Sequence, residues 1–261
     1  MAAVPLLAVL ASLLADTSGN RGAPIYSAES IANSAANVAA FYAANTFVTI
    51  YGQNLAYTTK EISLDDVRGQ NLPTVLTGTG VRVLINQIPA NIWYVSPMQV
   101  NLLIPPSLTA GPATVQLVVD GLAGPAITIA LNSSAPALFQ WDASTVVATH
   151  GNWPPITVSS PAKAGEVIVL YASGLGPTLP RAVPNQAPQG PAPLEHISDF
   201  RVLLNGVPVD SRRIEYAGAT PGYAGLFQIN LRLPEDAPPN PEIRVGYGDR
   251  LSPAQRYLPL Q

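Results

Sequence analysis

Few side chains in this chain of 261 residues could do acid–base or nucleophilic chemistry, since it has two histidines and no cysteine. A serine hydrolase needs a serine nucleophile, a histidine base and an acid that orients the histidine. Ser173, within Ala-Ser-Gly-Leu-Gly, lacks the Gly-x-Ser-x-Gly elbow of many such enzymes. We interpret His150, beside a glycine, and His196 as solvated loop residues. The sequence therefore predicts a protein that is not an enzyme.

Acidic residues occur as isolated pairs or single residues, namely Asp65-Asp66, Asp199 and Glu235-Asp236. A calcium loop brings several oxygen ligands together at fixed spacing, and no such loop occurs here, so we expect solvated carboxylates. The absence of cysteine excludes thiol catalysis and cysteine-type zinc sites. A two-carboxylate glycosidase stays open, because such pairs meet only in the fold. We expect no cofactor and no metal.

Aromatic side chains are a further candidate for ligand contact, because planar rings stack on the apolar faces of sugars. The candidate stacking residues are Trp153, Trp93 and Tyr94. We favour a packing role for Trp93 or Tyr94, which are adjacent and face opposite ways on a strand, and for Trp141 at a domain junction. Trp153 stands next to two prolines, and we expect it to be exposed.

The elements that would position these residues form a repeat. Three segments occur twice in the same order: Phe47–Leu55 with Val167–Leu175, Val81–Pro89 with Phe200–Pro208, and Gln99–Pro105 with Gln228–Pro234. Their offsets of roughly 120 to 130 residues indicate two copies of one domain. Short runs of β-branched residues between proline- and glycine-containing turns are typical of β-sandwiches. We predict an all-β fold of two tandem immunoglobulin-like β-sandwich domains, at residues 23–134 and 135–261.

One repeated strand carries two amides on its polar face. In the segment Gln228–Pro234, Ile229, Leu231 and Leu233 alternate with polar residues, so we expect these three in the core and Arg232 outside. The amides are Gln228 and Asn230 in the second copy and Gln99 and Asn101 in the first. We predict that they hold adjacent loop backbone and do not bind a ligand.

Turn residues distinguish the two copies. Asn205-Gly206 is the preferred pair for a type I′ hairpin, in which both central residues have positive φ. The first copy has Asn86-Gln87 instead, so Gln87 is either strained or part of a longer turn. Between Leu175 and Leu194 lies a proline-rich segment, which cannot be a central strand. We expect it to wrap the surface of its domain in extended conformation.

The N-terminus has the composition of a targeting signal. Ala2–Ala15 is almost wholly apolar and is followed by small and polar residues up to Asn20. Its length suits the apolar region of a signal peptide and is too short to span a bilayer. No Lys or Arg precedes it, and a buried first helix or strand is the competing interpretation. We predict a signal peptide at residues 1–22, a secreted or cell-surface protein, and no transmembrane segment in the mature chain.

The charge composition of the chain limits the classes of binding partner that we expect. Charged residues make up 11% of the chain and the net charge is −3, without blocks of Lys and Arg. Nucleic-acid binding needs a clustered basic surface, so we expect no nucleic-acid partner. The expected partners are a protein or a component of the cell envelope, or a polysaccharide.

The combined motifs resemble a known module. They include Val-Thr-Ile-Tyr-Gly-Gln-Asn-Leu-Ala, Trp-Tyr-Val-Ser-Pro-x-Gln-Val-Asn, Ser-Ala-Pro-Ala-Leu-Phe and Gly-Leu-Phe-Gln-Ile-Asn-Leu-Arg-Leu-Pro. Over approximately Ile31 to Tyr247 the chain resembles the uncharacterised C-terminal module of secreted Solibacter-type (Acidobacterial) proteins. Ile50–Leu55 also resembles the first strand and turn of immunoglobulin-like IPT/TIG domains. The resemblance implies a tandem IPT/TIG-like fold outside the cytoplasm and implies no catalytic residues.

Two functions follow from these observations. The first is a non-enzymatic, exported tandem module that acts in adhesion, as a spacer or in protein interaction. The alternative is a carbohydrate-binding module of an extracellular polysaccharide-degrading system. Binding to insoluble polysaccharides, and its loss in Trp153→Ala, separates the two.

Overall fold

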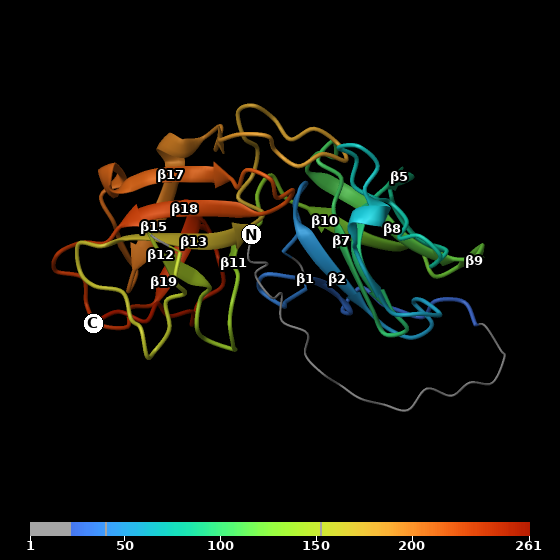
Figure 1. The fold of residues 1–261 in the computed structure, drawn as a ribbon, viewed down its shortest axis with the longest axis horizontal. Helices are drawn as coiled ribbons and strands as arrows, with labels where there is room; N and C mark the ends of the chain where they lie inside the picture. The colour runs from blue at the N-terminus through green and yellow to red at the C-terminus, as the bar shows by residue number, and fades with distance from the viewer. Residues whose placement is uncertain (1–21, 40, 152) are drawn as a thin grey trace.

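The computed structural model describes residues 22–39, 41–151 and 153–261, which form two β-sandwiches in succession along the chain (Figure 1). The helices in these ranges are single 3-10 turns, at Leu64–Asp66, Ile197–Asp199 and Ser211–Arg213. The predicted all-β tandem sandwich is therefore confirmed. The predicted signal peptide falls almost entirely outside the described residues, which begin at Gly22.

The first sandwich consists of two antiparallel sheets. One has the strand order β1 (Ile31–Asn33), β2 (Phe47–Tyr51), β7 (Gln99–Leu103), β6 (Asn91–Ser96) and β3 (Lys60–Glu61). The other has the order β10 (Ile127–Leu131), β8 (Gly111–Val119), β4 (Val81–Ile85) and β5 (Ile88–Pro89), with β9 (Leu122–Ala123) also paired to β8.

The second sandwich has the same construction. One sheet has the order β11 (Ala137–Leu138), β13 (Val167–Ser173), β18 (Phe227–Arg232), β17 (Ile214–Ala219) and β14 (Ala192–Pro193), with β12 (Ala148–His150) also paired to β13. The other has the order β16 (Val207–Pro208), β15 (Phe200–Leu204), β19 (Ile243–Tyr247) and β20 (Arg250–Leu251).

The two copies agree down to the pairing of single residues. Thr49 lies opposite Asn101 in the first copy, and Val169 lies opposite Asn230 in the second. Each copy has a β-bulge at the same place, at Trp93 between β6 and β7 and at Glu215 between β17 and β18. A bulge adds one unpaired residue and bends its strand. Its recurrence shows that the repeat seen in the sequence is a repeat of structure.

Each sandwich buries its own apolar cluster. The first cluster extends along the chain from Tyr26 to Leu131 and the second from Leu138 to Leu260. Strand alternation accounts for both, because every second side chain of a strand faces the opposing sheet. In β18 Leu231 is fully buried, whereas Arg232 is exposed. The register predicted for this strand is confirmed.

The two hairpin turns use different residues for one backbone conformation. Asn205 and Gly206 have φ of 48° and 79°, and Asn86 and Gln87 have φ of 49° and 65°. Both asparagines fix their turns, because the Oδ1 atom of Asn205 accepts a hydrogen bond from the N–H of Glu242, and Asn86 does the same at the equivalent strand. Gln87 therefore carries the left-handed strain that glycine avoids in the second copy.

Within the described ranges, the fold offers no helix with the length and apolar character needed to cross a membrane.

Candidate functional site

An apolar face of the first sandwich meets the second. Phe47 and Trp93 pack edge to face, with ring centroids 4.9 Å apart, and the neighbouring Leu103 is only 2% exposed. Gly225, between β17 and β18, lies against this face: a Cβ atom there would stand 2.3 Å from Leu103 Cδ1 and 3.0 Å from Phe47 Cε2. Because Gly225 also has a φ of 74°, its position favours glycine for both space and conformation.

Hydrogen bonds close the same junction. Ser173 is fully buried; its hydroxyl accepts a hydrogen bond from the N–H of Phe47 at 3.1 Å and donates to the carbonyl of Gly225 at 3.5 Å. Gln140 donates from Nε2 to the carbonyl of Ala35 at 2.9 Å. The serine considered as a nucleophile in the sequence is thus part of the contact between the two sandwiches.

The proline-rich segment between Leu175 and Leu194 extends across this junction (the gold loop at the top of Figure 1). The carbonyl oxygen of Asn185 accepts a hydrogen bond from the N–H of Leu72 at 2.7 Å. Its side-chain oxygen accepts another from Asn91 Nδ2 at 3.0 Å. The segment contacts its own domain, as expected, through the pairing of β14 with β17, and Asn185 in addition fastens it to the first sandwich. We call it the strap.

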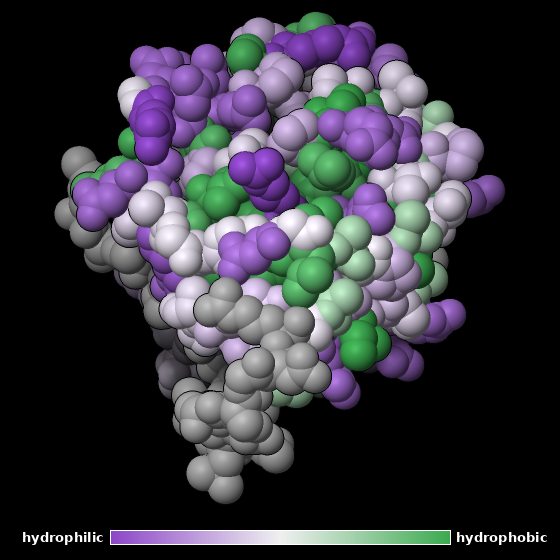
Figure 2. All heavy atoms as spheres, turned by 90° about the vertical axis from the view of Figure 1, so that its right-hand side faces the viewer, coloured by the Kyte–Doolittle hydropathy of each residue, from purple (hydrophilic) through white to green (hydrophobic). Residues whose placement is uncertain are grey.

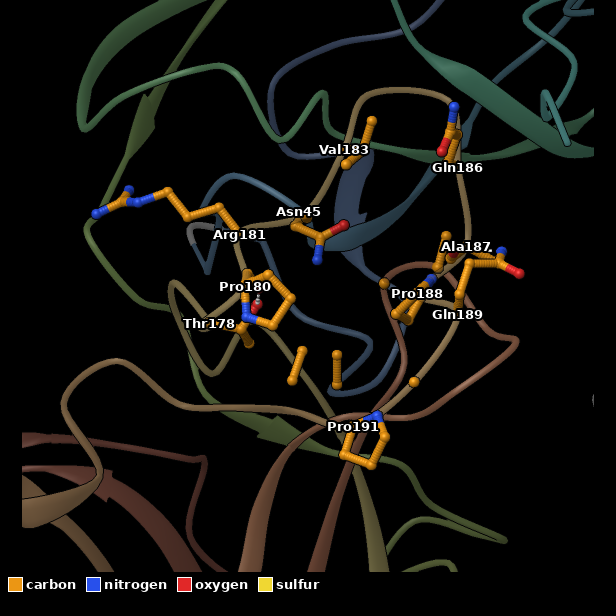
Figure 3. Close-up of a pocket in the computed structure, with 16 residues that line it drawn as sticks. Asn45, Thr178, Pro180, Arg181, Val183, Gln186, Ala187, Pro188, Gln189 and Pro191 are labelled. Carbon is orange, nitrogen blue, oxygen red and sulfur yellow. Dashed lines mark hydrogen bonds between the residues drawn. The ribbon is translucent and has the colours of Figure 1, made fainter.

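A cavity of about 270 Å³ lies under the strap, which is slightly smaller than the roughly 300–1,000 Å³ of typical small-molecule sites. Asn45 of the first sandwich stands among strap residues there, with Val183 and Gln186 on one side and Pro188 on another (Figure 3). Arg181 extends away from the centre (Figure 3). The lining is rich in proline and alanine, and its polar side chains come from few positions. This cavity is a consequence of the strap that joins the two copies.

A second depression, on the second sandwich, brings titratable groups together. His150 ends β12, and its Nδ1 atom lies 2.5 Å from Glu166 Oε1. Its Nε2 atom lies 3.3 Å from the hydroxyl oxygen of Ser160. The other oxygen of Glu166 accepts a hydrogen bond from the N–H of Lys163 at 2.9 Å. His150 is therefore not the solvated loop residue expected from the sequence, and the depression, open to solvent, also includes Gln261.

Trp153 stands next to this depression. Its side chain is 73% exposed, and its φ is 87°. A positive φ is rare for a bulky residue and costs conformational energy. The turn is held because the Trp153 N–H donates to the carbonyl of His150 at 2.9 Å, and Pro154 lines the depression. An exposed indole beside several polar groups is an arrangement that can contact a ligand.

The other two aromatic candidates are placed elsewhere. Trp93 is half-buried against Phe47 on the first sandwich, and Tyr94 is half-buried on the same strand. Trp153 belongs to the second sandwich, so the three residues do not form one platform. At the end of the first sandwich that faces away from the second, apolar side chains emerge in small groups separated by polar ones (Figure 2).

The paired amides contact each other. Gln99 Nε2 donates to Asn101 Oδ1 at 2.8 Å, and Gln228 Nε2 donates to Asn230 Oδ1 at 3.2 Å. In the described part of the chain these side chains make no hydrogen bond to loop backbone that would support the anchoring role predicted for them. They stabilise their own strand face, in the same way in both copies.

One acidic residue that we expected to be solvated is buried. Asp66 is 5% exposed and accepts hydrogen bonds from Lys60 Nζ, the N–H of Thr77 and both the N–H and the hydroxyl of Ser63. Burial by itself would raise the pKa of Asp66, but these donors outweigh it and hold the pKa well below its usual range. Asp66 thus stabilises the loop before β4 by hydrogen bonds to residues of the same sandwich.

Comparison with known protein families gives one domain match. An IPT/TIG domain is found at residues 37–140, which cover most of the first copy and the first few residues of the second. No curated protein matches the chain significantly.

Three solved structures are similar at low identity. The first is the surface glycan-binding protein PbSGBP-B from Prevotella bryantii, with 13% identity and a TM-score of 0.27 over 89% of this chain and 41% of that chain. The second is the tandem Ig repeats of Dlar, with 13% identity and a TM-score of 0.22 over 69% of this chain and 81% of that chain. The third is SGBP-B of the Bacteroides ovatus mixed-linkage glucan utilization locus in complex with a mixed-linkage heptasaccharide, with 12% identity and a TM-score of 0.29 over 97% of this chain and 69% of that chain. The chain thus spans less than half of the Prevotella protein. At these TM-scores the likenesses carry no functional argument.

Proposed function

We propose that the chain is an exported adhesion, spacer or protein-interaction module, with domains at residues 23–134 and 135–261 that act as one rigid body. The observation that carries this proposal is the closed junction, in which Gly225 packs on Leu103 and Asn185 bonds to the opposite sandwich. A flexible linker would let the two domains move independently. A fixed junction instead holds their outer loops at constant separation, which suits a spacer or a presenting surface.

Export is supported by the apolar segment Ala2–Ala15 and by the resemblance to a secreted Solibacter-type module. Cleavage behind small residues would give a mature protein that begins near Asn20. N-terminal sequencing of protein from the producing cell tests this. Intact Met1 on cytoplasmic protein would contradict export.

Partner binding is tested with the whole chain immobilised and exposed to solubilised cell envelope. We expect a specific envelope protein to be retained. A variant carrying both Leu103→Ala and Asn185→Ala, which loosens the junction, should retain it less well if rigid placement matters. Equal retention by the two proteins would contradict the rigid-body role, and retention of no protein would contradict the interaction role.

Carbohydrate binding is a second candidate, and exposed Trp153 is the observation that favours it. Its strained backbone holds the indole at the surface, where a sugar ring could stack on it. Binding to insoluble polysaccharides should be lost in Trp153→Ala. Tyr223→Ala is the matched control, because Tyr223 is also exposed, at 58%, but lies in the β17–β18 loop. Equal binding by both variants would exclude Trp153 as the contact.

A further inference from the structure

The depression beside Trp153 contains an arrangement that the binding role does not use. A carboxylate, an imidazole and a hydroxyl follow one another: Glu166 contacts His150 Nδ1 at 2.5 Å, and His150 Nε2 lies 3.3 Å from Ser160 Oγ. This is the order of contacts that activates a serine, with the base within reach of the nucleophile and oriented by a third group. Contacts between nucleophile and base are often long when no substrate is bound.

Each of the three groups is fixed by its surroundings. Glu166 is fixed through its second oxygen by the N–H of Lys163. Because an ionised Glu166 only accepts hydrogen bonds, it selects the His150 tautomer that carries its proton on Nδ1. The lone pair of Nε2 then faces Ser160. Ser160 is held in a tight turn by two backbone hydrogen bonds with Thr157.

We propose that Ser160 is a nucleophile that accepts acyl groups from esters with a short acyl chain, with His150 as general base and Glu166 as a positioning residue. Ser160 Oγ attacks the ester carbonyl while its proton passes to His150 Nε2. The carbon–oxygen bond to the alcohol breaks, and the alcohol leaves with the proton from His150. Water then attacks the acyl-serine, with His150 again taking and returning a proton, and the carboxylic acid is released.

The shape of the depression sets the substrate class and the rate. It is open to solvent, so it suits a small acyl group on a large or exposed alcohol. Pro161 follows Ser160 and has no N–H, so the backbone donor that often stabilises the oxyanion is missing. Lys163 and Gln261 line the same depression and are the side chains available for this role. We therefore expect slow turnover, fastest with activated esters.

This activity departs from the expectation of a non-enzymatic chain and is independent of the proposed binding role. The sequence does not reveal this arrangement, because Ser160 and Glu166 lie 10 and 16 residues from His150 in a loop without a known motif. Only the pairing of β12 with β13 brings His150 next to Glu166.

The test uses p-nitrophenyl acetate with the full chain, followed by mass spectrometry of the acetylated peptide. We expect acetylation at Ser160 and a loss of hydrolysis on the order of 100-fold or more in Ser160→Ala and in His150→Ala. Glu166→Gln should lower the rate and change its pH profile, which a purely structural role would not do. Thermal unfolding of each variant shows whether the fold is kept.

Ser159→Ala is the matched control. Ser159 lies in the same depression, but its hydroxyl contacts Thr157 Oγ1 at 3.1 Å and not the imidazole. The Ser159→Ala variant should hydrolyse the ester at the rate of the unmutated protein. Acetylation at Ser159 or at a lysine, or an unchanged rate in a folded Ser160→Ala variant, would overturn the proposal.

Discussion

The two copies differ most on one outer face of an otherwise repeated sheet. In the first copy Phe47 pairs with Leu103, and the bulge residue beside them is Trp93. In the second copy the paired residues are Val167 and Arg232 and the bulge residue is Glu215. Arg232 and Glu215 form an exposed ion pair at 2.7 Å. The first copy thus offers an apolar face that is covered, and the second a charged face that stays in water.

This difference distinguishes the inward-facing residues, which form the two cores, from the outward-facing residues, which join the two copies. The inward positions are apolar in both copies and fill two cores. The outward positions have diverged: among the described residues, this face of the first copy is covered by Gly225 of the second, and the equivalent face of the second copy carries the exposed ion pair.

The loops that lead to β4 and β15 differ in a related way. The loop of the first copy is fixed internally by buried Asp66. The corresponding strap of the second copy is fixed externally, by Asn185 on Leu72 and Asn91. One loop therefore stabilises its own sandwich, and the other stabilises the junction.

The sharpest test of the diverged face compares Leu103→Ala with Arg232→Ala at equivalent positions. Leu103→Ala should lower the free energy of unfolding by about 2–5 kcal/mol, because a buried side chain is lost and a cavity is left. Arg232→Ala should change it by only about 0.5 kcal/mol, because exposed ion pairs contribute little. Denaturant titration followed by tryptophan fluorescence measures both. Similar losses would mean that the two faces are not distinct.

Removing the charge of Asp66 should have the next largest effect. Asp66→Asn should cost about 1.5–3 kcal/mol, since hydrogen bonds to a buried charge are lost. The pKa of Asp66 in the fold lies below its unfolded value of about 3.9. Its contribution is therefore complete above about pH 4 and is lost as the pH falls through the folded pKa.

The measurement is thermal unfolding of both proteins from pH 7 to pH 2. The unmutated protein should lose stability more steeply below about pH 4 than Asp66→Asn does. Parallel curves would show that Asp66 does not fix its loop through its charge.

Removing one hydrogen bond of the strap should have a smaller effect on stability. Asn185→Ala removes the side-chain bond to Asn91 but keeps the backbone bond to Leu72, so a loss of about 0.5–1.5 kcal/mol is expected. The loss should appear as faster hydrogen exchange at the junction, with the two cores unchanged. Faster exchange throughout the first sandwich would mean that the strap supports that core and not the junction.

The hairpin turns should give the smallest effect. Gln87→Gly relieves a left-handed conformation but adds flexibility to the unfolded chain, for a net gain of about 0.5 kcal/mol. Gly206→Gln should cost a comparable amount in the second copy. Changes of melting temperature measure both, and a loss of stability in Gln87→Gly would show that its side chain makes a stabilising contact.

The sequence predicted the parts of this molecule that depend on local pattern. Repeated segments and strict alternation in β18 were enough to place Leu231 inside and Arg232 outside. Asn205-Gly206 was enough to predict its turn, because positive φ depends on the residues themselves.

Contacts between segments distant in sequence were not predictable in this way. Asn91 and Asn185 are 94 residues apart, and no periodicity relates them. The burial of Asp66 depends on Lys60 and Thr77, which reach it only once the loop folds. The amides of Gln228 and Asn230 share a strand face, as alternation predicts, but their bond to each other depends on side-chain rotamers. Alternation gives the direction of a side chain and does not give its partner.

We propose that the junction holds the two sandwiches as one body. The chain has no cysteine, so spin labels can be attached at Leu64→Cys in the first sandwich and Val158→Cys in the second, which are 91% and 85% exposed in the unmutated chain. Pulsed dipolar spectroscopy of this pair should give one narrow distance distribution, which broadens when Leu103→Ala and Asn185→Ala are added. A broad or multiple distribution with the junction intact would contradict a rigid arrangement of the two sandwiches.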